Sequence, residues 1–110
     1  MQKNLLGRLM LDLDSHSLTD EEKHILQNPQ VGGVILFSRN IFSSNQVISL
    51  CQEIKDINPW LLIAVDQEGG RIQRLAEGYT SLPSMQRLGQ YVSQNRKAGI
   101  ELANHLGWLM

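Results

Sequence analysis

The sequence has little of several features that mark common protein classes. It contains one cysteine among 110 residues, Cys51, so no internal disulfide can form and a reducing compartment is expected. No apolar run approaches the roughly 20 residues that a membrane-spanning helix needs. Gly7, Arg8 and Asp12 interrupt the first apolar stretch, which therefore does not resemble a signal peptide. We expect a cytoplasmic protein with no membrane span.

An excess of charge of one sign is also missing. Ten basic and eleven acidic residues leave a formal net charge of −1, and the basic residues are scattered along the chain. Without a basic face for a phosphate backbone, no nucleic-acid partner is expected. Aromatic residues make up only 5%, but the 42% hydrophobic content is typical of a folded domain rather than a disordered tail.

Familiar cofactor and nucleophile motifs are absent as well. The three histidines, His16, His24 and His105, do not have metal-ligand spacing, so no metal site is expected. No serine stands in a GxSxG motif, and Gly69-Gly70 is not part of a phosphate-binding GxGxxG sequence. Trp60 and Trp108 each border an apolar segment and are interpreted as packing residues.

The sequence does contain three apolar segments, Leu9–Leu13, Val31–Phe37 and Leu61–Val65, each followed by a polar break. The second and third do not alternate with polar residues. Continuous apolar strands are typical of parallel sheets that are covered on both faces, as in α/β proteins. The side chains expected to line the inner face of such a sheet are Val34, Leu36, Leu62 and Ala64.

Helices are predicted between these strands. Thr19 and Glu22 have the spacing of a capping box, and the helix that they begin should end near Asn28-Pro29. Ser43 and Gln46 form a second such pair before an apolar stripe that includes Cys51, interpreted as a small buried side chain. Strand starts that recur about every 25 residues predict consecutive strand–helix–strand crossovers.

The remainder is predicted to be an irregular stretch from Asp66 to Leu82, then a short helix, then a helix from about Asn95. The apolar stripe of this last helix reaches Met110, and no fourth strand follows it. We therefore expect residues 1–110 to be a truncated part of a larger domain.

Polar side chains gather where each apolar segment ends. Asp12 and Asp14 follow the first segment, Ser38-Arg39-Asn40 the second, and Asp66 to Gly70 the third. In parallel α/β folds, ligands bind at the carboxyl ends of the strands, because the connecting loops converge there. A site at this end is one interpretation, and the other is that these residues only solvate loops and cap helices.

Asp66 and Glu68 are the most suggestive pair. In an extended backbone, residues two apart point the same way with Cα atoms about 6.6 Å apart. Two carboxylates near that spacing could form the catalytic pair of a retaining glycosidase. The alternative is an ordinary acidic loop that Arg71 and Arg74 neutralise.

Two phrases, Val31–Asn40 and Ala64–Arg74, closely resemble glycoside hydrolase family three. More narrowly, they are similar to the cytoplasmic bacterial β-N-acetylhexosaminidases that recycle peptidoglycan. The resemblance implies an α/β fold that is the N-terminal portion, about three βα units, of a (β/α)8 TIM barrel about three times this length. Residues 1–110 would then be the N-terminal part of a single catalytic barrel.

The resemblance also implies a function. Members of this family remove terminal, non-reducing N-acetylglucosamine from muropeptides with retention of configuration and without a metal or organic cofactor. Their aspartate nucleophile and their histidine acid/base, which lies on a mobile loop, belong to strands beyond Met110. No catalytic residue is therefore assigned within this chain.

What carries over is substrate binding. Asp66 matches a family aspartate that accepts hydrogen bonds from hydroxyls of the N-acetylglucosamine, and Arg74 matches an arginine at the same subsite. The resemblance makes Glu68 a structural partner of a nearby arginine, and Arg39 and Asn40 loop-ordering residues. Two alternatives stay open: a non-catalytic sugar-binding module or decayed fragment, and an α/β enzyme that shares only the architecture.

Overall fold

The computed structural model describes residues 6–110, which form two compact units joined between Val65 and Asp66. The first unit contains the strand and helix repeats that the sequence predicts. The second contains a short hairpin and a pair of helices. Each unit is described by itself below.

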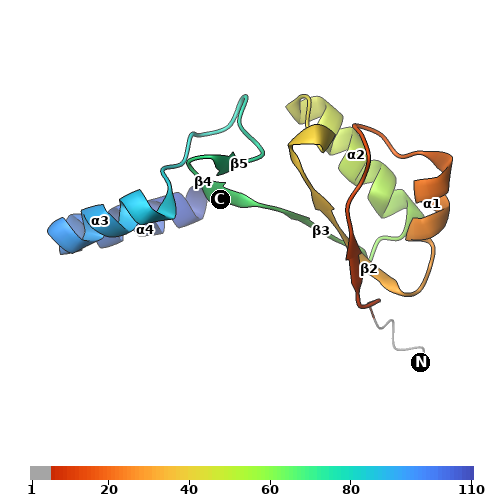
Figure 1. The fold of residues 1–110 in the computed structure, drawn as a ribbon, viewed down its shortest axis with the longest axis horizontal. Helices are drawn as coiled ribbons and strands as arrows, with labels where there is room; N and C mark the ends of the chain where they lie inside the picture. The colour runs from red at the N-terminus through yellow and green to blue at the C-terminus, as the bar shows by residue number, and fades with distance from the viewer. Residues whose placement is uncertain (1–5) are drawn as a thin grey trace. The chain divides into compact units, whose positions relative to one another are not determined.

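The first unit is built on a parallel sheet with the order β1-β2-β3 (Figure 1). Its strands are β1 (Leu9–Leu11), β2 (Val31–Leu36) and β3 (Leu62–Val65). Helix α1 (Asp20–Leu26) connects β1 to β2, and helix α2 (Ser44–Ile57) connects β2 to β3 after the short 3-10 turn η1 (Ser38–Asn40). The predicted α/β class is confirmed, and the order of elements is that of the N-terminal portion of a (β/α)8 barrel.

Both predicted helix starts are present, but only the first is a complete capping box. In α1 the Thr19 hydroxyl accepts from the backbone of Glu22, and the Glu22 carboxylate accepts in return from the backbone of Thr19. In α2 the Ser43 hydroxyl caps the backbone of Gln46, whereas the Gln46 side chain accepts from Phe42 one residue earlier. The α1 helix ends at Leu26, two residues before the predicted boundary.

The strand register corrects the expected inner face of the sheet. Val34 and Leu36 pair with Ile63 and Val65, so they lie on the opposite face from Leu62 and Ala64. Val34 and Leu36 are buried, at 0% and 3% exposure, whereas Leu62 is 54% exposed. Grouping the four residues on one face was wrong, because the parallel pairing offsets the two apolar segments by one residue.

The core of the first unit lies between the sheet and its two helices. Besides the sheet residues, its most buried side chains come from the ends and inner faces of the helices and from the loop before β3: Leu26, Leu50, Ile54 and Leu61. Cys51 lies on α2 as predicted, but is only half-buried. Burial raises the pKa of its thiol, which therefore stays protonated near neutral pH.

The second unit differs from the predicted irregular stretch at its start. Strands β4 (Gln67–Gly69) and β5 (Ile72–Gln73) form an antiparallel hairpin directly after Asp66. Gly69 and Gly70 have φ angles of 86° and 61° in the left-handed region, which allows the tight reversal between the strands. The sequence did not predict these short strands, because apolar and polar residues hardly alternate here and two glycines are adjacent.

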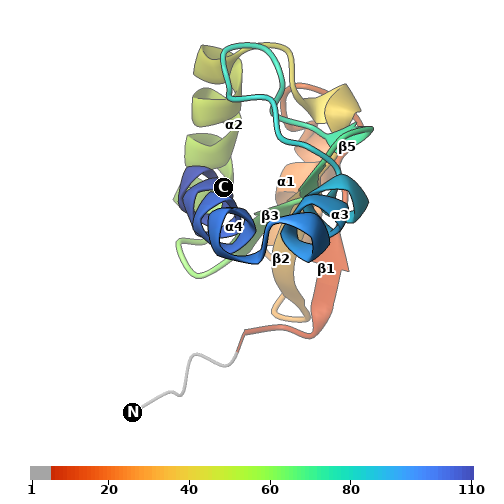
Figure 2. The same cartoon turned by 90° about the vertical axis from the view of Figure 1, so that its left-hand side faces the viewer.

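Helices α3 (Met85–Gln94) and α4 (Arg96–Leu109) complete the second unit and pack side by side (Figure 2). The close approach requires a glycine, because a Cβ atom at Gly99 would lie 2.5 Å from the Cα atom of Val92. Contrary to the packing interpretation, Trp60 and Trp108 are 62% and 91% exposed. Among residues 6–110, no helix has the length and apolar character to cross a bilayer.

Candidate functional site

Arg39 links the two loops that follow β1 and β2. Its guanidinium forms an ion pair with Asp12, and its Nε donates to the carbonyl oxygen of Leu13 at 2.9 Å. The guanidinium carbon lies 5.1 Å from the centre of the Phe37 ring. This side chain therefore orders the loop at the carboxyl end of β1, as the resemblance implied.

Asn40 is the fully buried polar residue of the first unit, at 0% exposure. Its Nδ2 donates to the carbonyl oxygens of Leu13 and Ser15 at 2.9 and 2.8 Å, and its Oδ1 accepts from the backbone of Phe37 at 2.9 Å. All these partners are backbone groups of the same two loops. A loop-ordering role for Asn40 is thus evident from its contacts.

In the second unit, Asp66 and Arg74 lie close together across the hairpin. The nearest oxygen of the Asp66 carboxylate is 4.0 Å from an Arg74 guanidinium nitrogen. The side chain of Asp66 is 42% exposed and that of Arg74 is 21% exposed. A partly exposed carboxylate beside a largely buried guanidinium presents an acceptor and a donor to one ligand, which is the chemistry that polyhydroxylated molecules need.

Two glutamines that the sequence analysis did not single out hold this loop. Gln67 bonds the backbone of Arg74 and Leu75 through both ends of its amide. Gln73 bonds the backbone of Leu75, Thr80 and Leu82 in the same way. Both face backbone groups that no strand or helix satisfies. In the sequence, the only indication that these two glutamines have such a role is their position in a polar segment of low strand propensity.

The glycine pair is held against the start of α3. Gly70 donates its N–H to the carbonyl oxygen of Leu82 at 2.8 Å, and a Cβ atom at Gly69 would lie 2.1 Å from the carbonyl oxygen of Pro83. Residues 69–70 and 82–83 therefore approach each other too closely for any side chain. This contact fixes the far end of the loop that carries Arg74.

Glu68, unlike Asp66, does not lie beside an arginine in this loop. Its side chain is exposed, and none of the ion pairs found between residues 6 and 110 includes it. The expected partnership with an arginine is therefore not formed. Asp66, and not Glu68, is the carboxylate that the fold places beside Arg74.

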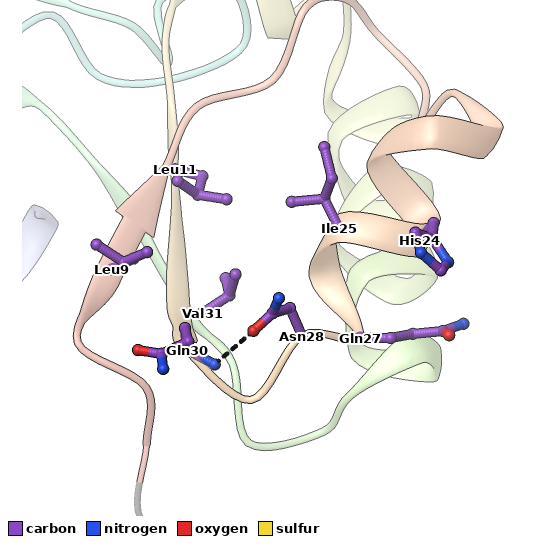
Figure 3. Close-up of a pocket in the computed structure, with 8 residues that line it drawn as sticks. All are labelled: Leu9, Leu11, His24, Ile25, Gln27, Asn28, Gln30 and Val31. Carbon is purple, nitrogen blue, oxygen red and sulfur yellow. Dashed lines mark hydrogen bonds between the residues drawn. The ribbon is translucent and has the colours of Figure 1, made fainter.

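A hollow of about 420 Å³ lies at the other end of the first unit's strands, between β1 and α1 (Figure 3). Leu9 and Val31, the first residues of β1 and β2, contribute to it, as does Ile25 of α1. Its polar side includes Asn28, whose side-chain Oδ1 accepts from the backbone N–H of Gln30. Its lining contains neither a carboxylate nor an arginine, so the hollow lacks the charged groups that Asp66 and Arg74 provide.

Within residues 6–110 no three histidine, cysteine, aspartate or glutamate side chains gather closely enough to hold a metal ion. The candidate site consists of Asp66 and Arg74, and Gln67 is the glutamine that bonds the backbone of Arg74. The chain that carries this site is similar to known proteins in both sequence and structure.

The family model described as the glycosyl hydrolase family 3 N terminal domain matches residues 6–110. This chain belongs to that family. It is 49% identical over 106 residues to a β-hexosaminidase of Thioalkalivibrio sulfidiphilus, and 51% identical over 104 residues to one of Pseudomonas aeruginosa. These alignments cover 96% and 94% of the chain but 30% of each relative, so the chain spans about a third of the length of these relatives.

The same likeness holds in three dimensions. The structure superposes with a TM-score of 0.81 and 45% identity on NagZ from Neisseria gonorrhoeae in complex with N-trifluoroacetyl-D-glucosamine, over 89% of this chain and 29% of that one. The resemblance to glycoside hydrolase family three and the N-terminal position of the segment are thus confirmed.

Proposed function

We propose that the chain is the N-terminal part of a retaining β-N-acetylhexosaminidase and contributes its sugar-binding loop. The enzyme removes terminal, non-reducing N-acetylglucosamine from muropeptides during peptidoglycan recycling in the cytoplasm. Residues 1–110 form the N-terminal part of its single catalytic barrel. Asp66 and Arg74 bind the N-acetylglucosamine.

The observation that carries this proposal is the approach of Asp66 to Arg74 within a loop that the Gln67 and Gln73 amides and the contact between residues 69–70 and 82–83 hold in place. An ionised carboxylate that accepts two hydroxyl hydrogen bonds gives strong and directional recognition of a sugar. The adjacent guanidinium donates to the sugar oxygens and balances the charge. The ligand named for the N. gonorrhoeae relative is an N-acylated glucosamine, which supports this class of substrate.

The bond-breaking groups lie outside this segment in the proposal. A retaining mechanism needs a nucleophile and an acid/base on opposite sides of the glycosidic bond. The family's aspartate nucleophile and histidine acid/base fall in the part of the relatives that this chain does not match. The role of residues 1–110 is therefore to position the sugar for those groups.

The test uses the complete protein, meaning the protein expressed from the whole reading frame that contains these residues. Asp66→Ala removes the charged acceptor of the sugar hydroxyls. We expect a loss of about 1.5–3 kcal/mol in transition-state stabilisation, measured as kcat/KM on 4-nitrophenyl N-acetyl-β-glucosaminide.

Glu77→Ala is the matched control, since Glu77 is an exposed acidic residue of the same loop with the same charge. It should leave kcat/KM near the wild-type value. If Asp66→Ala behaves like Glu77→Ala, the assignment of the sugar site is wrong.

The alternative is a non-catalytic sugar-binding module that uses the same two residues, Asp66 and Arg74, and carries out no hydrolysis. The reading frame downstream of Met110 discriminates between the two. A frame that encodes a Lys-His-x-Pro-Gly-type loop supports the enzyme. A protein that binds N-acetylglucosamine through Asp66 but has no turnover supports the module.

A further inference from the structure

The amide of Gln67 ties the residue after Asp66 to the backbone of Arg74. Its Oε1 accepts from the N–H groups of Arg74 and Leu75, each at 3.1 Å, and its Nε2 donates to the carbonyl oxygen of Leu75 at 2.9 Å. One side chain thus satisfies three backbone groups of the segment that carries Arg74. Because Gln67 directly follows Asp66, these bonds limit how far the two sugar-site residues can separate.

The contact between Asp66 and Arg74 cannot set this spacing by itself. At 4.0 Å it is longer than the 2.7–3.2 Å typical of an N–H···O hydrogen bond, so it supplies attraction without direction. The Gln67 bonds are shorter and have defined geometry. They also leave the carboxylate oxygens of Asp66 available for sugar hydroxyls.

We propose that Gln67 is the positioning residue of the sugar site, and that its amide holds Arg74 beside Asp66 so that both side chains reach the same N-acetylhexosamine. The inference rests on the proposed function, because it takes Asp66 and Arg74 as the sugar-binding pair. Gln67 acts through the backbone of Arg74 and does not itself touch the sugar.

Gln73 provides an internal comparison. Its amide also bonds three backbone groups of the same loop: the carbonyl oxygens of Leu75 and Thr80 at 3.0 and 2.9 Å, and the N–H of Leu82 at 2.9 Å. None of them belongs to Arg74. Loss of the Gln73 amide therefore removes as many loop bonds without releasing the residue that pairs with Asp66.

The first experiment compares Gln67→Met with Gln73→Met in the complete protein. Methionine is close in length to glutamine but forms none of these bonds. We expect Gln67→Met to raise the Kd for N-acetylglucosamine about 10-fold, as measured by calorimetric titration. The reason is that the net contribution of hydrogen bonds of this kind corresponds to about a tenfold change in an equilibrium constant. Gln73→Met should lower the thermal unfolding midpoint by about as much as Gln67→Met does, but it should leave the Kd within about twofold of wild type.

Gln67→Glu gives a second readout that a purely structural role would not move. The introduced carboxylate can accept from Arg74 and Leu75, but only its protonated form can donate to the Leu75 carbonyl oxygen. The Kd of this variant, relative to wild type at the same pH, should therefore fall as the pH is lowered from 6 to 4, the range in which a glutamate carboxyl with an ordinary pKa of about 4.3 gains its proton. The ratio removes effects of Asp66, Glu68, Arg71 and Arg74, which both proteins share.

The outcomes separate this inference from the proposed function. If Asp66→Ala weakens binding but Gln67→Met matches Gln73→Met in Kd, the positioning role is overturned and the sugar site stands. If Asp66→Ala itself leaves the Kd unchanged, the proposed site fails and the role of Gln67 fails with it. A selective rise in Kd for Gln67→Met, with recovery of Gln67→Glu at low pH, supports the inference.

Discussion

In the loops of this protein, single side chains form the hydrogen bonds to backbone groups that strands and helices form elsewhere. Asn40, Gln67 and Gln73 each bond three backbone groups that lie outside the sheets and helices. A buried backbone group without a partner costs about 1–3 kcal/mol, so each amide removes several such costs at once. These side-chain amides therefore hold the backbone of the loops that follow β1, β2 and β3.

Glu22 gives a residue-level test by pH. Burial raises the pKa of its carboxyl, but hydrogen bonds from the backbone of Thr19 and Asp14 outweigh that effect, and the net pKa is lowered from 4.5. A lowered pKa in the folded state means that the contribution to stability is present above 4.5 and is lost as pH falls through the folded value. In the complete protein, we expect the stability difference between wild type and Glu22→Gln to shrink below pH 4.5.

The measurement is the free energy of unfolding by urea between pH 7 and pH 3. Glu21→Gln serves as its control, because Glu21 has the same charge on the same helical turn and is exposed. A difference that stays constant with pH would show that the ionised Glu22 carboxylate is not what caps α1.

The β4–β5 hairpin depends on glycine at its turn, whereas α3 does not depend on the glycine within it. Gly69 has a φ of 86° and lies against Pro83, but nothing lies within 4 Å of a Cβ atom added at Gly89. The same substitution should therefore have opposite effects in the two elements.

In the complete protein, Gly69→Ala should lower the free energy of unfolding by at least about 2 kcal/mol, from left-handed strain and the clash with the Pro83 carbonyl. Gly89→Ala should raise it by about 0.5–1 kcal/mol, because alanine loses less backbone entropy on forming a helix. Urea unfolding measures both values. A stable Gly69→Ala variant with unchanged N-acetylglucosamine binding would contradict the account of the turn.

The first unit, taken by itself, leaves apolar groups without cover. Among residues 6–110, no strand pairs with the outer edge of β1 or of β3. Leu9, Met10 and Leu62 are each about half exposed, at 53%, 47% and 54%. Unpaired strand edges present backbone N–H and C=O groups that pair with other chains. Full burial of such a side chain is worth about 1.5–3 kcal/mol, so each half-exposed side chain leaves about half of that stabilisation unrealised in this unit.

The 110-residue chain expressed alone should therefore self-associate or unfold without a steep transition, and should not hydrolyse 4-nitrophenyl N-acetyl-β-glucosaminide. Size-exclusion chromatography, chemical denaturation and the hydrolysis assay provide the measurements. A sharp monomer peak with cooperative unfolding would show a self-sufficient domain and favour the sugar-binding module. Turnover near that of a full-length relative would contradict the assignment of the catalytic groups to other segments.

Sequence alone determined the three parallel strands, the helices and the family of this protein, because these depend on local patterns, whereas the β4–β5 hairpin was not predicted. Apolar segments, the Thr19 capping box and the phrase from Ala64 to Arg74 are each readable within a few residues. Asp66 and Arg74 were identified through that phrase. Their proximity in the structure agrees with the prediction, while their binding of a sugar remains a prediction.

Tertiary structure alone decided which face of the sheet each side chain occupies and which groups brace the site. The offset between β2 and β3 placed Val34 and Leu62 on opposite faces, and this offset depends on how two distant segments pair. The partners of Gln67 likewise lie seven and eight residues away, across a turn that two glycines permit. Such contacts arise only when the chain closes on itself, since a glutamine in a sequence does not indicate which backbone groups it will meet.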